Sequence, residues 1–351
     1  MRVGLLLCVL ACSPPDSPPS TITSAGSSGA HSSVGGTGGT GGTIAVAQGG
    51  QSGTTPHTAG TAAGGTTPVD MLTLKQPIER DGKLVLEFGS TYFSVDPGHG
   101  ARIVSLRVAE HELLKLTGAP NFADAFGSTF WPSPQSWPWP PPAELDVERY
   151  AARVDAPHTL VLTSEPHEGT RLRVTKRFAP DLVREALLLE YAMTNTGDAA
   201  ISWAPWEITR MPADGLAFWP TGGSPFGDSP LAYQAALGHT WCSPAQTEGE
   251  AKLFADGAGG YLAYATAGGI LIKQFADIPA VSAAPDEAEV ELYVNADHSY
   301  VEVENQGAYA SIAPGQTVRW QVTWYARRLP PGVSVTAGNA DLIAFVRETL
   351  Q

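Results

Sequence analysis

Hydrophobic and polar residues alternate with a period of two in several segments between residues 71 and 351. The hydrophobic positions of the four clearest segments are Leu84, Leu86 and Phe88; Leu172 and Val174; Val290, Leu292 and Val294; and Val318, Trp320, Val322 and Trp324. Successive side chains of a β-strand point to opposite faces, so this alternation predicts strands with one buried face. Turn signals such as Asp81-Gly82 and Pro314-Gly315 separate the segments and favour antiparallel hairpins.

Two further segments have to be assigned to either helix or strand. Residues 185–195 contain an Ala-Leu-Leu-Leu run, which a helix would also accommodate. We predict a long strand there, because the segment ends in a turn after Asn195 and follows the alternating residues 171–178. Residues 341–350, with Asn339 as the N-cap, are predicted to form a helix that covers an edge or an end of a sheet.

These segments predict an all-β fold. About fifteen strands in one unit point to a large antiparallel sandwich of two sheets with a short C-terminal helix. No unit of about 20–50 residues recurs along the sequence, which excludes a propeller or a solenoid.

The first twelve residues have the features of a bacterial export signal. Arg2 is the only charge, residues 3–10 are apolar, and Ala11 precedes Cys12. The apolar run is too short to span a bilayer, which takes about 20 residues. Residues 9–12 (VLAC) resemble the lipobox of bacterial lipoproteins, whose cysteine receives lipid. We therefore expect a lipid anchor on Cys12 and a place in the bacterial cell envelope, at the outer membrane or on the periplasmic face.

Residues 13–70 differ in composition from the rest of the chain. They contain no Lys, Arg or aromatic residue and are rich in Gly, Ser and Thr. Such a segment cannot bury enough apolar area to offset its chain entropy, so we predict a disordered tether. The expected organisation is thus a signal peptide with the lipobox cysteine over residues 1–12, the tether over 13–70, and one sandwich domain over 71–351 that holds all 9 Trp residues.

The formal net charge of −14 restricts the partners. Phosphates of nucleic acids and many lipid head groups are negative, so the acidic chain lacks the basic surface that binding them requires. We expect no nucleic-acid partner, and membrane attachment through the lipid on Cys12 only.

Established catalytic and metal-binding motifs are absent from the sequence. There is no nucleophile elbow, HExxH, CxxC pair, P-loop or EF-hand loop, and the histidines lack metal-ligand spacing. We therefore predict no cofactor and no metal site. Cys242 stands alone beside Trp241 and is expected to be a packed small residue.

Residues 130–142, here called the Trp-Pro segment, contain Trp131, Trp137 and Trp139. The segment is too rich in proline for a helix or a central strand, so we predict a stiff loop. Indole faces are good platforms for the C–H faces of a sugar. The alternative is that the indoles pack beneath the loop, and we expect one or two of the three to be exposed.

Glu207 and Arg210 lie among aromatic residues in the segment 203–210. A regular strand would direct these two side chains to opposite faces, whereas a bulge or the strand end would bring both into one cleft. The alternative interpretation is a surface ion and an edge salt bridge.

Glu302 and Glu304 share one face of a predicted strand, about 7 Å apart. Repulsion between the two carboxylates would raise the pKa of one, which would then serve as a general acid or base. Alternatively, each carboxylate is paired with a cation such as Arg102 or Lys273.

Residues 100–107 (GARIVSLR), followed by Glu112-Leu113-Leu114, resemble the opening strands of galactose mutarotase-like (aldose 1-epimerase-like) domains. The strand that ends at Arg210 and the segment 300–309, followed by Pro314-Gly315-Gln316, correspond in order to the central strand and the late Glu-bearing strand of these domains. The resemblance implies a β-supersandwich with a sugar-sized cleft on one concave face.

In the enzymes of this family, a Glu on the late strand takes the proton of the anomeric hydroxyl and a His protonates the ring oxygen. By position Glu304, or else Glu302, matches the Glu. The His is unmatched, and its segment offers Glu207 as an acid and Arg210 as a ligand for a hydroxyl or a carboxylate.

Three hypotheses follow from this resemblance. The first is an exported lipoprotein that binds a saccharide, with Arg210, Glu302 and Arg102 and the three indoles as binding residues. The second is an aldose 1-epimerase-like isomerase with Glu304 and Glu207 as catalytic residues. The third is a non-catalytic structural or interaction module.

Overall fold

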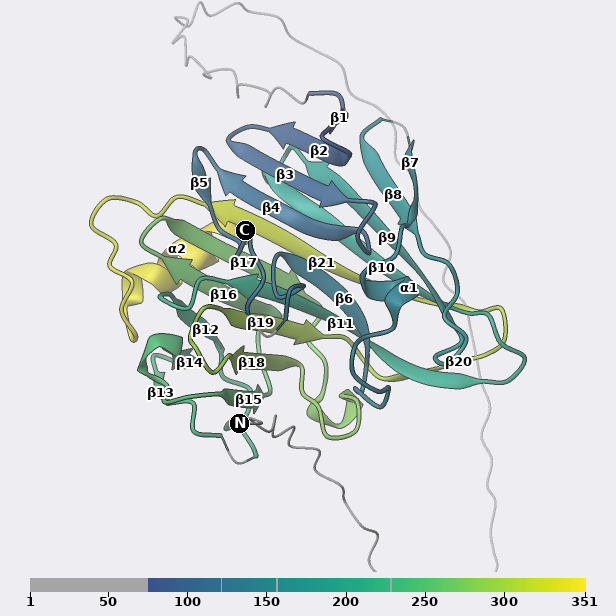
Figure 1. Cartoon of the computed structure of the whole chain (residues 1–351). Helices are drawn as coiled ribbons and strands as arrows, with labels where there is room; N and C mark the ends of the chain where they lie inside the picture. Colours follow the sequence, from purple (N-terminus) through teal and green to yellow (C-terminus); the bar gives the residue numbers. More distant parts are fainter. Residues whose placement is uncertain (1–74, 121, 156, 228) are drawn as a thin grey trace, which may run out of the picture. The chain divides into compact units, whose positions relative to one another are not determined.

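The computed structural model describes residues 75–120, 122–155, 157–227 and 229–351. The predicted signal peptide, Cys12 and the predicted tether lie outside these residues. The described part of the chain forms two antiparallel sheets, and Figure 1 shows their order. The two sheets contain 11 and 10 strands, more than the fifteen or so expected, because several strands of two to four residues carry no readable alternation.

The first sheet contains the strands that position the candidate site. Its central path, in spatial order, is β1 (Ile78–Arg80), β2 (Lys83–Phe88), β3 (Thr91–Asp96), β4 (Arg102–Val108), β6 (Ser128–Ser133), β11 (Ile201–Met211), β19 (Val301–Gln306), β18 (Val290–Val294) and β15 (Ala251–Ala255). Two short strands pair at its side, β5 (His111–Glu112) with β4 and β20 (Ala310–Ile312) with β11.

The second sheet packs against one face of the first. Its order is β13 (Tyr233–Ala236), β14 (His239–Cys242), β12 (Leu216–Pro220), β16 (Tyr261–Thr266), β17 (Gly269–Phe275), β21 (Thr317–Arg327), β10 (Ala186–Asn195), β9 (Leu172–Asp181), β8 (Thr159–Thr163) and β7 (Ala151–Asp155). The predicted strand over 185–195 is confirmed as β10, and β9 is its partner as expected.

The main hydrophobic core lies between the two sheets. Phe130 of β6 stacks on Tyr191 of β10 with ring centroids 4.5 Å apart, and Phe93 of β3 meets Phe178 of β9 edge to face at 5.4 Å. Residues that point away from this core, on the other side of the first sheet, define what we call its outer face. The alternation of the strands thus separates core residues from residues available to a site.

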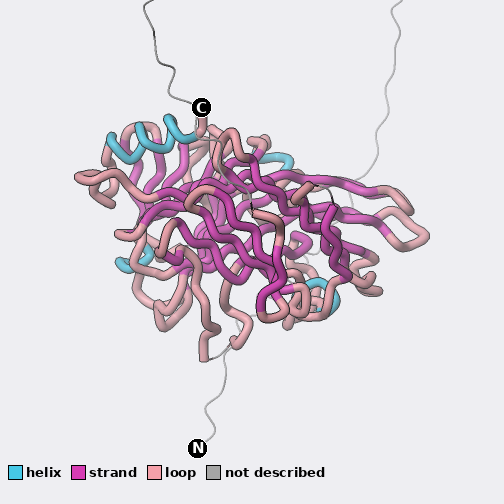
Figure 2. The backbone as a smooth tube through the Cα atoms, turned by 90° about the horizontal axis from the view of Figure 1, so that it is seen from above, coloured by secondary structure: helices cyan, strands magenta, loops and turns pink. Residues whose placement is uncertain are grey.

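Helix α2 (Ala340–Thr349) confirms the predicted C-terminal helix. The Asn339 side chain caps it by accepting a hydrogen bond from the backbone N–H of Asp341 at 2.9 Å. Leu342, Ile343 and Val346 are buried in a second hydrophobic cluster against the second sheet. Figure 2 shows this helix outside the layers of strands. The remaining helical segments are short, namely α1 (Ala143–Asp146) and the 3-10 turns Pro244–Gln246 and Ala280–Ser282.

The prediction of a loop for the whole Trp-Pro segment was wrong at its start, because residues 130–133 belong to the central strand β6. Pro132 lies opposite Pro205 of β11. The carbonyl oxygen of Pro132 accepts a hydrogen bond from Nε1 of Trp137, on the side of β6 that faces away from β11. On that side β4 pairs with β6 only through Ile103 and Ser128. The missing N–H of Pro132 is therefore not needed by a neighbouring strand, and the proline is tolerated.

None of the helices in the described part is both long enough and apolar enough to cross a membrane.

Candidate functional site

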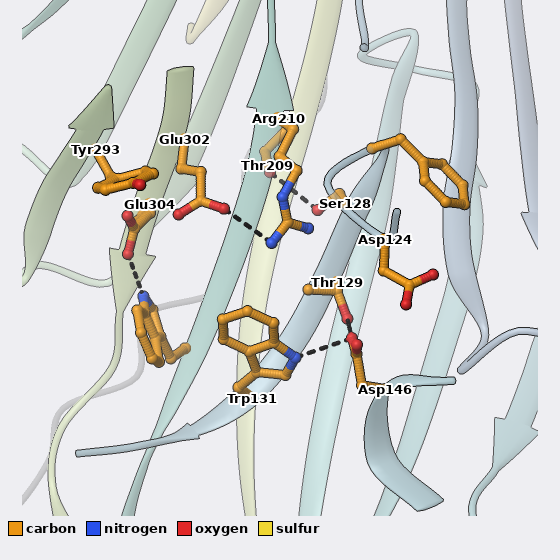
Figure 3. Close-up of polar contacts among 12 residues, drawn as sticks. Asp124, Ser128, Thr129, Trp131, Asp146, Thr209, Arg210, Tyr293, Glu302 and Glu304 are labelled. Carbon is orange, nitrogen blue, oxygen red and sulfur yellow. Dashed lines mark hydrogen bonds and ion pairs between the residues drawn. The ribbon is translucent and has the colours of Figure 1, made fainter. Parts of the chain in front are cut away.

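Three adjacent strands, β6, β11 and β19, place the candidate residues on the outer face of the first sheet. In the register of β11 and β19, Arg210 lies opposite Glu302 and Ile208 lies opposite Glu304. In the register of β11 and β6, Trp206 lies opposite Trp131. Strands that are remote in sequence thus bring an arginine, two glutamates and two indoles onto one face. Figure 3 shows Arg210, Glu302, Glu304 and Trp131 together.

Arg210 is fully buried at the centre of this face. Its Nη2 lies 2.8 Å from Oε1 of Glu302, and its guanidinium carbon lies 5.6 Å from the ring centre of Phe122 and 5.5 Å from that of Trp131. Within the described residues, Nε and Nη1 have no hydrogen-bond partner. Unpaired N–H groups of a buried guanidinium are costly, so this side chain is suited to receive an acceptor from a ligand.

Glu304 is also fully buried, and only one of its oxygens is engaged. Oε2 accepts hydrogen bonds from Nε1 of Trp206 at 2.8 Å and from Nζ of Lys252 at 3.2 Å. Oε1 has no partner among the described residues. Burial raises the pKa of Glu304 to about 8, with further contributions from Glu291 and Glu302, although Lys252 opposes the shift. Its proton equilibrium therefore falls near neutral pH.

Lys252 of β15 lies between the carboxylates of Glu291 and Glu304. Its Nζ lies 2.7 Å from Oε2 of Glu291 and 4.8 Å from the ring centre of Trp206. Burial would lower the pKa of Lys252, but the carboxylates of Glu291 and Glu304 outweigh it and raise that pKa. Burial also raises the pKa of Glu291 to about 7. The ammonium group is thus a fixed positive charge, while the carboxylates around it titrate.

Asp146 positions the indole that faces Arg210. Its Oδ1 accepts hydrogen bonds from Nη2 of Arg102 at 2.8 Å, from Oγ1 of Thr129 at 2.8 Å and from Nε1 of Trp131 at 2.9 Å. Burial opposes ionisation of Asp146, but Arg102 and these donors outweigh it and hold the pKa of the carboxyl below its usual range. Arg102 therefore supports the site through Asp146, and its guanidinium is fully buried.

The rest of the Trp-Pro segment packs over the same region. Trp137 is buried, whereas Trp139 is 47% exposed, with its ring centre 4.9 Å from that of Phe122 and 6.1 Å from that of Trp131. One indole of the three is thus exposed, as expected. Trp139, Phe122 and Trp131 form a chain of aromatic rings that leads from the surface to Arg210.

Glu207 lies on the opposite side of the first sheet, because β11 alternates regularly at this point. Its Oε1 lies 2.8 Å from Nζ of Lys273 and accepts a hydrogen bond from Nε1 of Trp324 at 3.0 Å, while its Oε2 accepts one from the hydroxyl of Tyr191. All of these partners belong to the second sheet or to the core between the sheets. The structure therefore does not bring Glu207 together with Arg210 and Glu304.

Each of the two late glutamates is paired with a cation, as the alternative interpretation expected, but the two cations suggested as partners were wrong. Glu302 pairs with Arg210 and Glu304 with Lys252, whereas Arg102 pairs with Asp146 and Lys273 with Glu207. The sequence pattern does not single out Lys252, Glu291 or Asp146 as members of the site. The alternation in residues 290–294 marks Glu291 as facing away from Leu292, but nothing in the sequence indicates that β15, β18 and β19 are neighbours.

The described residues also bear on metal binding and on the thiol of Cys242. No group of three or more His, Cys, Asp or Glu side chains there is arranged to hold a metal ion. Cys242 is buried, and burial raises the pKa of its thiol, which makes the thiolate unfavourable.

Comparison with known proteins gives matches among solved structures only. No family model matches the chain, and no curated protein matches it. A galactose mutarotase-like protein from Lactobacillus casei superposes with a TM-score of 0.51 and 13% identity over 70% of this chain and 100% of that one. A candidate aldose 1-epimerase from Klebsiella pneumoniae gives a TM-score of 0.51 and 10% identity over 80% of this chain and 86% of that one. The described domain has the galactose mutarotase-like fold.

The same fold occurs in larger proteins. A TPR-domain-containing protein from Parabacteroides distasonis gives a TM-score of 0.50 and 17% identity over 73% of this chain, which spans about half (49%) of that protein. The galactose mutarotase-like fold confirms the predicted resemblance and the predicted sandwich. Identities of 10–17% establish the fold alone.

Proposed function

We propose that the galactose mutarotase-like domain binds a saccharide on the outer face of its first sheet. The observation that carries the proposal is the pairing of unsatisfied groups at the centre of this face. Among the described residues, Nε and Nη1 of Arg210 are donors without acceptors, and Oε1 of Glu304 has no hydrogen-bond partner. A sugar offers hydroxyl groups that both donate and accept, so it would satisfy both residues.

The aromatic rings support the same ligand class. Trp139 exposes about half of its surface next to Phe122 and Trp131. An indole face packs well on the C–H face of a pyranose, and the neighbouring polar groups would fix its orientation. The names of the Lactobacillus and Klebsiella structures point to sugars as well.

Calorimetric titration with a panel of monosaccharides and a glycan array would test binding. Trp139→Ala should weaken binding at least about tenfold, because the substitution removes one stacking face. Tyr233→Ala is the matched control, since Tyr233 is equally exposed (47%) but lies on β13 of the second sheet. Binding that is unchanged in Trp139→Ala, or a panel without any bound sugar, would contradict the proposal and favour an interaction module.

The second candidate function is isomerisation of sugar anomers, and the buried Glu304 favours it. With a pKa of about 8, its carboxylate is a capable base at slightly alkaline pH. It would take the proton of the anomeric hydroxyl as the bond between the anomeric carbon and the ring oxygen breaks. The ring oxygen would receive a proton from an acid, which gives the open-chain aldehyde. Glu207, the acid considered from the sequence, faces the core, so the proton would have to come from another donor.

Exchange spectroscopy of glucose and galactose anomers separates binding from isomerisation. An isomerase should accelerate exchange above the spontaneous rate, and Glu304→Gln should abolish the acceleration. A rate equal to that of buffer, in the presence of demonstrated binding, would leave binding as the function.

Attachment to the cell envelope through lipid on Cys12 is part of the same proposal. The motif VLAC over residues 9–12 supports it, and these residues lie outside the described part. Metabolic labelling with a fatty acid in a bacterial host should label the protein and its Cys8→Ala variant but not Cys12→Ala. Equal labelling of all three would refute the anchor.

A further inference from the structure

The outer face of the first sheet carries more carboxyl groups than cationic groups around the candidate site. Arg102 and Asp146 form an ion pair and neutralise each other. Apart from this pair, two cations lie near a larger set of carboxyl groups. The cations are Arg210 and Lys252, and the carboxylates are Glu250, Glu287, Glu291, Glu302 and Glu304. Since Arg210 and Glu302 pair with each other, the remaining excess of carboxyl groups lies around Lys252.

We propose that the saccharide bound at this face carries a protonated amino group, which the carboxylate of Glu304 receives. This inference rests on the proposed sugar-binding function and specifies its ligand as an amino sugar. The geometry supports it, because Lys252 is shared between Glu291 at 2.7 Å and Glu304 at 3.2 Å through one oxygen of each residue. Oε1 of Glu304 is left for another donor, and an ammonium group forms the stronger, charge-assisted hydrogen bond.

The way in from solvent is also suited to a cation. Lys252 keeps 27% of its side chain exposed, so this end of the site is not sealed. Tyr293 of β18, whose hydroxyl donates to Glu250 at 2.9 Å, offers an aromatic face near Glu302 and Glu304 (Figure 3). Aromatic faces attract ammonium groups, which adds to the charge complementarity.

Proton linkage gives this proposal a distinctive signature. The charged groups that act on Glu304 are Lys252 from β15, Glu291 from β18, Glu302 from β19 and, through the sheet, Lys273 from β17. In the free protein Glu304 is mostly protonated at pH 7, because burial and the neighbouring carboxylates raise its pKa to about 8. An ammonium ligand would favour the carboxylate form, so binding should release about one proton.

The test compares glucosamine with glucose, N-acetylglucosamine and glucuronic acid, and galactosamine with galactose. The amino sugars should bind more tightly than their neutral counterparts, and the gain should be larger at pH 8 than at pH 7. A charge-assisted hydrogen bond is stronger than a neutral one by roughly tenfold in affinity, but release of the Glu304 proton offsets much of this advantage at pH 7. N-acetylation should remove the gain, and glucuronic acid should bind most weakly. Calorimetry at pH 7 in two buffers of different ionisation enthalpy should show about one proton released for glucosamine and none for glucose.

Glu304→Gln should bind glucosamine and glucose equally and release no proton. Glu190→Gln is its matched control, because Glu190 is paired with Arg319 at 2.7 Å on the second sheet, away from the site. The wild-type comparison with N-acetylglucosamine needs no variant, so the proposal stays testable if Glu304→Gln fails to fold. Equal affinity for glucosamine and glucose would overturn the amino-sugar inference alone, whereas no binding of any sugar would overturn the proposed function.

Discussion

The ion pair of Lys273 and Glu207 is the sharpest stability test that the fold offers. Both side chains are fully buried between the two sheets, with Nζ and Oε1 2.8 Å apart. Lys273 also donates hydrogen bonds to Oγ1 of Thr209 and to the carbonyl oxygen of Val303, each at 3.0 Å. We predict that Lys273→Met strongly destabilises the domain, because Glu207 then remains as an uncompensated charge in the core.

The expected magnitude follows from the burial of both partners. Removing one member of a buried ion pair costs about 3–5 kcal/mol of unfolding free energy, most of it from the stranded charge. Glu207→Gln in the Lys273→Met background removes that charge and still accepts a hydrogen bond from Trp324. The double variant should therefore recover about 2 kcal/mol relative to Lys273→Met.

Urea unfolding followed by tryptophan fluorescence would measure these differences, with the slope of free energy against urea as a check on the transition. The variant Lys83→Met provides a control, because its pair with Asp96 is partly exposed (40% and 23% of the two side chains) and should be worth less than about 1 kcal/mol. A loss of less than about 1 kcal/mol in Lys273→Met, or a double variant no more stable than the single one, would refute the assignment of Glu207 and Lys273 as a structural pair.

Three further predictions concern the helix cap, a tight turn and pH. Asn339→Ala should lower the unfolding free energy by about 1 kcal/mol, measured by urea unfolding, because Asp341 N–H loses its acceptor. Gly100→Ala should cost at least about 2 kcal/mol in the same assay, since φ is +63° and the new Cβ would lie 1.9 Å from the carbonyl oxygen of Asp146. The melting temperature should fall as pH rises from about 5 to 8, because the folded state binds the Glu304 proton more tightly (pKa about 8) than the unfolded chain does, and Glu304→Gln should flatten this fall. An unchanged slope in that variant would contradict the raised pKa.

Sequence periodicity predicted the fold because the sandwich buries one face of most strands. The strand Ala186–Asn195 and its partner Leu172–Asp181 show how well alternation works where a strand is long. Short strands such as His111–Glu112 could not be found, since two residues cannot establish a period. The strand Ser128–Ser133 was missed for a different reason, as the rule against proline in central strands assumes a paired neighbour on both sides.

The candidate site was partly predictable from alternation within one strand. Alternation placed Glu302 and Glu304 on one face, as the structure shows. It left open whether a bulge would bring Glu207 and Arg210 together, and the regular register of β11 places them on opposite faces. It could not supply their partners, because pairing depends on which strands are neighbours and in which register. Lys252, for example, reaches Glu304 across the intervening strand β18, whose Glu291 it also contacts.

The same reasoning explains why the charged side chains on the two faces of β11 and its neighbours have different consequences. Glu207 and Lys273 pair with each other and form their other hydrogen bonds inside the core. Neither side chain is therefore available to a ligand. Arg210 and Glu304, on the opposite face, keep donors and an acceptor without partners among the described residues. A one-residue slip of β11 would exchange Glu207 and Arg210 between the two faces, because it would turn every side chain of the strand to the other face. Register at β11 therefore decides which charges stabilise the sandwich and which remain available to a ligand.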